Sequence, residues 1–269
     1  MGRMTSEIAT LGLLDDDEIE LDSAALLLSE LDHDGIELEP YYALLDDIGD
    51  RLAQFTAADT PEEQGEALAQ VFHDDFGFTG DGDSYDAPLN ADLIRVLDRR
   101  RGLPVSLSLL YVAAARRMGW TAHVTNTPGH VLVRLGDAAP HLIDPFHDGE
   151  PVAGDRLAML LAGALGPGTT PGPEHVAPMS NRATLVRLLL NQASRAERGG
   201  DPTRALALYE RMAAIAPDNG DAWWELARLQ LQLHDVDAAR HSLSAMLEIT
   251  RDRERRELIT TTLRAIAES

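Results

Sequence analysis

Two residues of this 269-residue chain, His130 and Asp144, are of the types and in the local settings that can do acid–base chemistry. His130 follows Pro-Gly at the start of a predicted strand, and Asp144 ends the predicted strand His-Leu-Ile-Asp. A carboxylate can fix the tautomer of a histidine, and that histidine can then act as a general base on a nucleophile. Catalysis by this pair therefore needs a nucleophile from another part of the chain.

The nucleophile is the missing part. The chain contains no cysteine, which excludes thiolate catalysis, disulfides and cysteine-ligated metal centres. Ser106 and Ser108 lie near the start of the predicted helix 106–119, where a serine could attack with His130 as its base. The same serine could instead cap the helix or bond its own backbone, and the chain has no Gly-x-Ser-x-Gly elbow. We favour a site without catalysis; the alternative is a serine hydrolase (esterase or amidase) using Ser106, His130 and Asp144.

Metal chemistry is the other possibility for this region. Several side chains are of ligand type, but their spacing in the sequence fits no compact motif: His73, Asp74, Asp75, His130, Asp144, His147 and Asp148. The acidic loop from Asp81 departs from a calcium loop, with Asp86 where a glycine belongs and Asp92 in place of the final glutamate. We therefore expect neither a metal nor another cofactor.

The charged residues exclude further classes and point to a kind of partner. All 23 basic residues are arginines, so Schiff-base lysine chemistry and the Walker A lysine are excluded. The net charge of −22 comes from the first third: residues 1–92 hold 25 acidic residues and two arginines, and the remainder holds 20 and 21. This charge repels nucleic acid and is explained by a solubilising acidic surface. Alternatively, the acidic third attracts a basic partner or folds back onto the arginines 99–101.

The hydropathy pattern gives no sign of a membrane protein. No apolar run approaches the 18 residues that span a bilayer, and the start of the chain lacks the basic-then-apolar order of a signal peptide. We expect a cytoplasmic protein with no membrane partner.

The elements that position the site begin with helices. The first twenty residues are predicted to be flexible, and helical patterning begins near Asp22. Thr60 is a strong helix start, because Pro61 follows it and Glu63 stands three residues after it in the capping-box pattern. Asn90 is expected to cap another helix.

The apolar period changes after the helix at 106–119. Residues from Trp120 to Asp144 read as three short strands separated by Pro-Gly and Gly-Asp turns. A helix is expected next, followed by a Gly/Pro-rich linker at 166–178, which is the best domain boundary.

The chain repeats itself after this linker. With a shift of 34 residues the following pairs superimpose: Leu189 with Trp223, Ala193 with Ala227, Ala205 with Ala239, Tyr209 with Leu243, and Met212 with Met246. This is the tetratricopeptide period, with small residues where paired helices cross closely. Two repeats and a last helix predict five helices. Trp224 is left over from the repeat pattern, so we expect it on the surface of the repeat domain, facing either a partner or the first domain.

Together these motifs resemble the SirB-type family of bacterial proteins, in which a transglutaminase-like domain precedes tetratricopeptide repeats. The resemblance runs from about Phe76 to the C-terminus and rests on three short motifs: Gly102, Pro104, Ser106 and Leu107; Pro128, Gly129 and His130; Asp144, Pro145 and Phe146. Counted back from Gly119, the nucleophile position of active transglutaminase-like enzymes falls at or near Pro104, so the resemblance implies a family that has given up this cysteine.

The resemblance implies an α+β protein: a helix-rich transglutaminase-like domain with a small antiparallel sheet, then an all-α tetratricopeptide-repeat domain. We expect a flexible N-terminus at 1–20, the first domain at 21–165, the linker at 166–178 and the repeats at 179–269. A cleft is expected to be lined by the motif residues Arg101, Gly102, Pro104, Ser106, Pro128, Gly129, His130, Asp144 and Phe146. The expected function is interaction with a protein or peptide, without catalysis.

Overall fold

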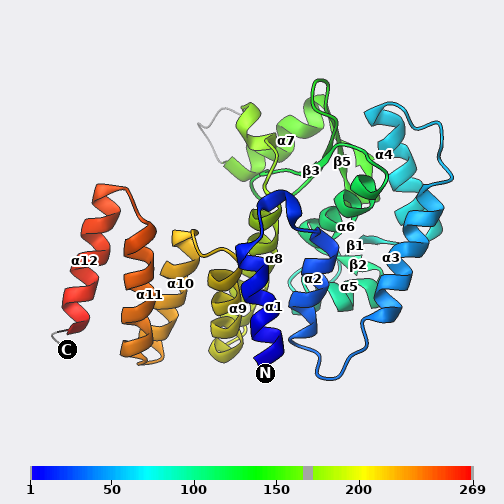
Figure 1. The fold of residues 1–269 in the computed structure, drawn as a ribbon. Helices are drawn as coiled ribbons and strands as arrows, with labels where there is room; N and C mark the ends of the chain where they lie inside the picture. The colour runs from blue at the N-terminus through cyan, green and yellow to red at the C-terminus, as the bar shows by residue number, and fades with distance from the viewer. Residues whose placement is uncertain (1, 166–171, 268–269) are drawn as a thin grey trace. The chain divides into compact units, whose positions relative to one another are not determined.

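The computed structural model describes residues 2–165 and 172–267, which fall into two units (Figure 1). One unit is Asp16–Leu188, and the other joins residues 2–15 to residues 189–267. Each is described by itself below.

The unit Asp16–Leu188 is built around one buried helix, α6 (Pro104–Arg117). Every residue of α6 from Pro104 to Ala115 is buried, as expected for a helix that is apolar or small on all sides. Four helices contact it or its neighbours: α2 (Leu21–Glu30), α3 (Glu39–Leu52), α4 (Pro61–Ala69) and α5 (Leu93–Arg99). The short π-helical turn η2 (Gln70–Asp75) continues α4. The core of the unit therefore surrounds α6.

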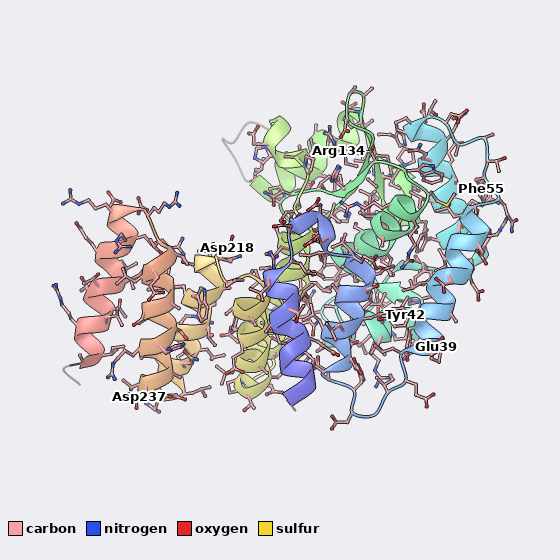
Figure 2. The ribbon with its side chains drawn as sticks, viewed as in Figure 1. Glu39, Tyr42, Phe55, Arg134, Asp218 and Asp237 are labelled. Atoms are coloured by element: carbon pink, nitrogen blue, oxygen red, sulfur yellow. The ribbon has the colours of Figure 1, made fainter. Side chains whose placement is uncertain are left out.

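A four-stranded antiparallel sheet also packs on α6, and it contains the predicted strands. Its strands are neighbours in chain order: β3 (Ala122–Val124), β4 (Val133–Leu135), β5 (His141–Asp144) and β6 (Glu150–Pro151). Val133 pairs with both Val124 and Ile143, which fixes the register of β3, β4 and β5. Arg134, labelled in Figure 2, donates from Nη2 to the Asp137 carbonyl at 2.9 Å, closing the β4–β5 turn. The α+β prediction is confirmed; β6 was not anticipated.

A second, smaller pairing was also not anticipated. The two-residue strands β1 (Thr79–Gly80) and β2 (Arg101–Gly102) pair in parallel, with Gly80 opposite Gly102. Strands this short leave no periodic pattern in a sequence, and a parallel partner is necessarily distant along the chain.

The helix starts confirm one prediction and correct another. Thr60 Oγ1 accepts a hydrogen bond from the Glu63 amide, and Glu63 Oε2 accepts one from the Thr60 amide, which is the predicted capping box. Asn90 does not cap α5; Asp92 does, accepting from the Arg95 amide. Asn90 is instead buried in a short 3-10 turn, η3 (Pro88–Asn90).

Of the predicted linker 166–178, the structure describes residues 172–178. Residues 166–171 lie outside the described residues. The rest follows α7 (Gly154–Leu165) and includes the 3-10 turn η5 (Pro173–Val176). Pro178 forms a β-bridge with Thr125, and the Met179 amide donates to the Val124 carbonyl at 2.7 Å. This stretch is therefore attached to the edge of β3, and the boundary at 179 stays a prediction.

The other unit contains the predicted repeat helices. From Leu189 the helix α8 (Asn181–Arg198) leads into α9 (Pro202–Ile215), α10 (Gly220–Gln232), α11 (Val236–Ile249) and α12 (Arg253–Ala267). From α9 onward each helix contacts the next, and they form a row in Figure 1. The small residues at repeat-equivalent positions are all buried: Ala193, Ala205, Ala227 and Ala239. The five helices predicted after the linker are present.

The N-terminal residues differ from the prediction of a flexible segment. Residues 2–13 form the helix α1 (Gly2–Leu13), followed by the 3-10 turn η1 (Asp16–Glu18). Ile8 and Leu11, one helical turn apart, are buried, and α1 contacts α9. Its packing partner lies about two hundred residues downstream, so the local sequence gives little sign of it. Among the described residues, no helix has the length and apolar content needed to cross a membrane.

Candidate functional site

Asp144 is the centre of the candidate site. It ends β5 and caps the 3-10 turn η4 (Pro145–His147), where its Oδ1 accepts from the Phe146 amide at 3.0 Å. Its other oxygen, Oδ2, lies 2.8 Å from His130 Nε2 and 2.7 Å from His147 Nδ1. The carboxylate is fully buried. Burial alone would raise the pKa of Asp144, but the hydrogen bonds from the two histidines hold it below its usual range.

The predicted contact between His130 and Asp144 is present, although His130 is not in a strand. It lies in a turn three residues before β4 begins, after Gly129 with a φ of +73°. The turn brings the imidazole over the end of β5, where 16% of the side chain stays exposed. Its ring also meets Phe146 edge-on, with the centroids 5.9 Å apart. His130 is therefore held by a carboxylate and an aromatic ring.

His147 completes the group, and the sequence reasoning did not select it for the site. The turn η4 places it on the same side as Asp144, three residues away, and half of its side chain is exposed. A signal was present in the sequence, because positions i and i+3 coincide in a 3-10 turn and Pro145 favours such a turn. Together the two histidines surround one oxygen of a buried carboxylate.

Gly80 connects this group to the Gly102 motif. Gly80 pairs with Gly102, and a Cβ on Gly80 would lie 2.3 Å from the Phe146 carbonyl oxygen. The strand β1 therefore lies directly against η4, at a distance that only glycine permits. The structure thus brings the Gly-x-Pro and Asp-Pro-Phe motifs together, although β1 did not figure in the prediction.

Ser106 does not join the site as a nucleophile. Its hydroxyl lies 2.9 Å from the Asn90 carbonyl and 3.0 Å from the Leu103 carbonyl, and donates to them. The side chain is fully buried, and none of its hydrogen bonds goes to His130. This geometry does not favour the alternative in which Ser106, His130 and Asp144 form a hydrolase triad. Pro104 occupies the first position of α6 and is also buried.

The other predicted cleft residues are found in mixed settings. Arg101 is exposed, and its Nη1 lies 3.6 Å from Asp83. Arg99 forms a closer pair with the buried Asp81, at 2.6 Å. The basic run 99–101 therefore meets acidic residues of the first third, as one of the two alternatives predicted. The cleft as a whole stays a prediction.

The sequence matches two protein-family models. The model described as "Transglutaminase-like superfamily" matches residues 39–190, more than half of the chain, and includes every residue of the candidate site. The chain belongs to the transglutaminase-like superfamily. A tetratricopeptide-repeat model matches residues 198–260, which confirms the order of domains that the SirB-type resemblance implies.

Curated relatives agree with this assignment. A UPF0162 protein of Xylella fastidiosa (strain 9a5c) is 28% identical over 246 residues, 89% of this chain and 87% of the relative. A UPF0162 protein of Pseudomonas aeruginosa is 31% identical over 176 residues, 65% of this chain and 64% of the relative. Human F-box only protein 21 is 39% identical over 69 residues, 26% of this chain and 11% of that protein.

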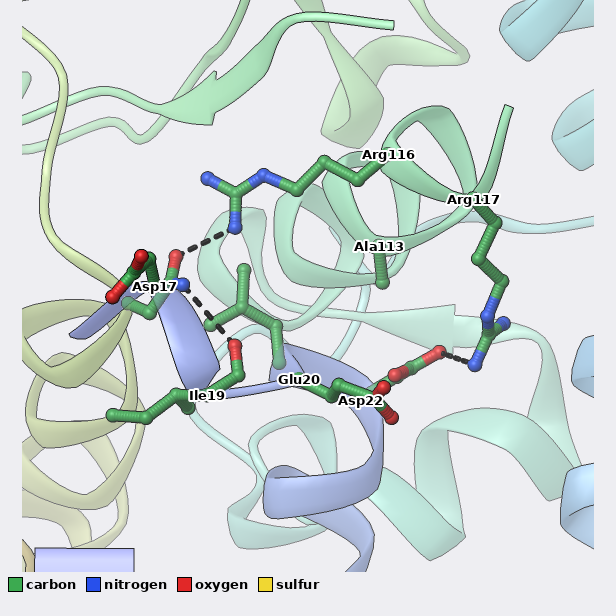
Figure 3. A pocket seen from close by; sticks show the side chains of 9 residues that line it. Asp17, Ile19, Glu20, Asp22, Ala113, Arg116 and Arg117 are labelled. Carbon is green, nitrogen blue, oxygen red and sulfur yellow. Dashed lines mark hydrogen bonds and ion pairs between the residues drawn. The ribbon is translucent and has the colours of Figure 1, made fainter. Parts of the chain in front are cut away.

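The unit Asp16–Leu188 also has a polar pocket of about 320 Å³, which neither of the two histidines lines (Figure 3). In it Arg117 lies 2.5 Å from Asp22, and Arg116 donates from Nη1 to Asn181 Oδ1 at 2.6 Å. Burial raises the pKa of Asp22, which the neighbouring arginine opposes. Arg116, Arg117 and Asp22 therefore already have partners within the pocket. We interpret these contacts as a structural network that connects α2 and α6 to Asn181 at the start of α8.

Trp224 of the repeat domain lies against a hydrophobic cluster. Trp224 is half-buried and packs with Trp223 against the core cluster Ala227, Leu243, Met246 and Ile259. Part of the Trp224 side chain is exposed, and its role in docking stays a prediction.

Proposed function

We propose that this protein is a cytoplasmic interaction and regulatory protein that uses a transglutaminase-like scaffold for binding and performs no acyl transfer. The observation that carries the proposal is the position of Ser106. Its hydroxyl is buried and bonded to the Asn90 and Leu103 carbonyls, so the His130–Asp144 pair does not have the Ser106 hydroxyl to activate. The absence of cysteine from all 269 residues removes the usual nucleophile as well.

The repeat helices support the interaction part of the proposal. Tetratricopeptide repeats stack helix pairs into extended surfaces that receive peptides or helices of partner proteins. Residues 182–269 hold 13 arginines and 13 acidic residues, whereas residues 1–92 carry a charge of −23. We expect a near-neutral docking surface on the repeats and salt-sensitive attraction of basic partners by the first third. Nucleic acid is not an expected partner, because phosphate contacts need a positive surface.

Affinity capture with the whole protein immobilised as bait tests the proposal. The bait is compared with its His130→Ala variant at low and high salt, and the captured proteins are quantified. Specific partners whose recovery falls with salt are the expected result. Turnover of ester or amide substrates by the purified protein, lost in His130→Ala, would instead establish a hydrolase.

A further inference from the structure

Three metal-ligating atoms converge in the transglutaminase-like domain. His130 Nε2, Asp144 Oδ2 and His147 Nδ1 all lie within 4.8 Å of one another, and each nitrogen is within 2.8 Å of the shared oxygen. Around a zinc ion with bonds of about 2.0–2.2 Å, neighbouring ligand atoms are about 3 Å apart. Small side-chain movements would therefore open a coordination site between the three atoms.

The backbone already holds the carboxylate in the orientation such a site needs. The Phe146 amide bonds Oδ1 at 3.0 Å, which leaves Oδ2 directed at both histidines. A hydrogen bond of this kind orients a metal-ligating carboxylate and is part of well-formed metal sites. Asp144 is fully buried, whereas half of His147 is exposed, so an ion could enter from the His147 side.

The donor set selects the class of ion. Two imidazoles and one carboxylate suit borderline transition metals such as Zn²⁺, whereas Ca²⁺ and Mg²⁺ prefer oxygen ligands. Three protein ligands leave at least one position open for water or for a ligand group from a partner. We propose that His130, Asp144 and His147 form a binding site for one divalent transition-metal ion of the zinc class. This inference is independent of the interaction proposed above.

The expectation of no metal rested on spacing in the sequence. The separation of 14 residues between His130 and Asp144 matches no helical zinc motif, but the turn before β4 and the turn after β5 bring the donors together.

One nearby positive charge, that of Arg156, opposes the binding of a cation. Arg156 Nη2 lies 3.8 Å from Asp144 Oδ2, and Glu150 partly neutralises it as its closer partner.

The chain supplies a matched control. His33 Nε2 lies 2.6 Å from Asp92 Oδ2, which is the same kind of histidine–carboxylate pair, and His33 is about as buried as His130. It is not part of any group of three metal-ligating residues among those that the structure describes. A His33→Ala variant therefore loses a histidine–aspartate contact without losing a donor of the proposed site.

Calorimetric titration of Zn²⁺ into chelator-treated, tag-free full-length protein tests the proposal. Excess Mg²⁺ is present to occupy exposed carboxylates. Wild type and His33→Ala are expected to bind one ion with equal affinity, and His147→Ala at least about tenfold more weakly. Circular dichroism checks that each variant is folded.

Two results would overturn the proposal: no stoichiometric binding by the wild type, or equal affinity in His147→Ala. Should His147→Ala fail to fold, Arg156→Ala decides the question, since it keeps all three donors. Removal of that cation is expected to tighten zinc binding, and unchanged or weaker binding would contradict the site.

Discussion

Arg99 reaches across from the end of α5 to Asp81, whose carboxylate is buried, with Nη2 at 2.6 Å from Oδ2. The same carboxylate accepts from the amide and hydroxyl of Ser84, while Arg99 also donates to Asn90. Burial opposes ionisation of Asp81, but these bonds hold its pKa far below the usual range. The network ties the loop 81–90 to the helix that follows it.

Replacing Asp81 with Asn should lower the free energy of unfolding by about 3 kcal/mol at pH 7, because it breaks a buried ion pair. Since the folded-state pKa is depressed, the stabilisation is present above about pH 4 and is lost as the pH falls further. Urea unfolding at several pH values should give a shallower acid decline in Asp81→Asn than in wild type.

The control is Asp83→Asn, because Asp83 is 95% exposed and 3.6 Å from Arg101. It should change stability by less than about 0.5 kcal/mol. Equal losses in the two variants would contradict the account of the Asp81 network.

Gly80→Ala should destabilise the transglutaminase-like domain by about 2 kcal/mol, because the new Cβ would lie 2.3 Å from the Phe146 carbonyl. Gly82→Ala is the matched control, since a Cβ there meets nothing within 4 Å. Thermal unfolding of both variants measures the difference. A Gly80→Ala protein as stable as Gly82→Ala would mean that β1 and η4 can move apart at little cost.

A fluorophosphonate probe should leave Ser106 unlabelled, because its hydroxyl is buried and bonded to backbone carbonyls. Intact-mass spectrometry of the treated protein is the measurement, with a known serine esterase as the positive control. Ser106→Ala should cost about 1 kcal/mol of stability through the lost hydrogen bonds. Stoichiometric labelling of Ser106 would restore the hydrolase alternative.

In the repeat domain, Glu197→Ala should cost about 1–2 kcal/mol. Both oxygens of Glu197 accept from Arg228 Nη2, at 2.7 and 2.8 Å, and Tyr209 also donates to it. These bonds lower the pKa of Glu197 against the effect of burial. Glu257→Ala, which breaks an exposed pair with Arg253, should cost at most about 0.5 kcal/mol in the same denaturation experiment.

Local signals in the sequence predict much of this fold. The Thr60 capping box depends on residues three apart, and the repeat helices depend on a period of 34, so both can be read without knowledge of tertiary structure. The change from helical to strand period near Trp120 likewise predicts the antiparallel sheet. The family resemblance adds the order of the two domains, which the family matches confirm.

The features missed depend on contacts between distant residues. The pairing of Gly80 with Gly102 and the packing of α1 on α9 leave no periodic trace. Asp92, and not Asn90, caps α5. The Asn90 side chain is engaged elsewhere, because it donates to the Ser84 carbonyl and accepts from Arg99. At the site, the His130–Asp144 contact was predicted from the motifs, but His147 was not, because only the turn η4 shows that both histidines meet one oxygen.

The contact of α1 with α9 has a consequence for how the chain is made. Gly12 approaches the Ala214 carbonyl so closely that a Cβ there would meet it at 2.2 Å. On a ribosome, residues 2–13 emerge about two hundred residues before their partner helix. The apolar face of α1, with Ile8 and Leu11, must therefore wait uncovered while the whole transglutaminase-like domain is synthesised. A bulky group fused next to α1 would accordingly interfere with completion of the repeat domain.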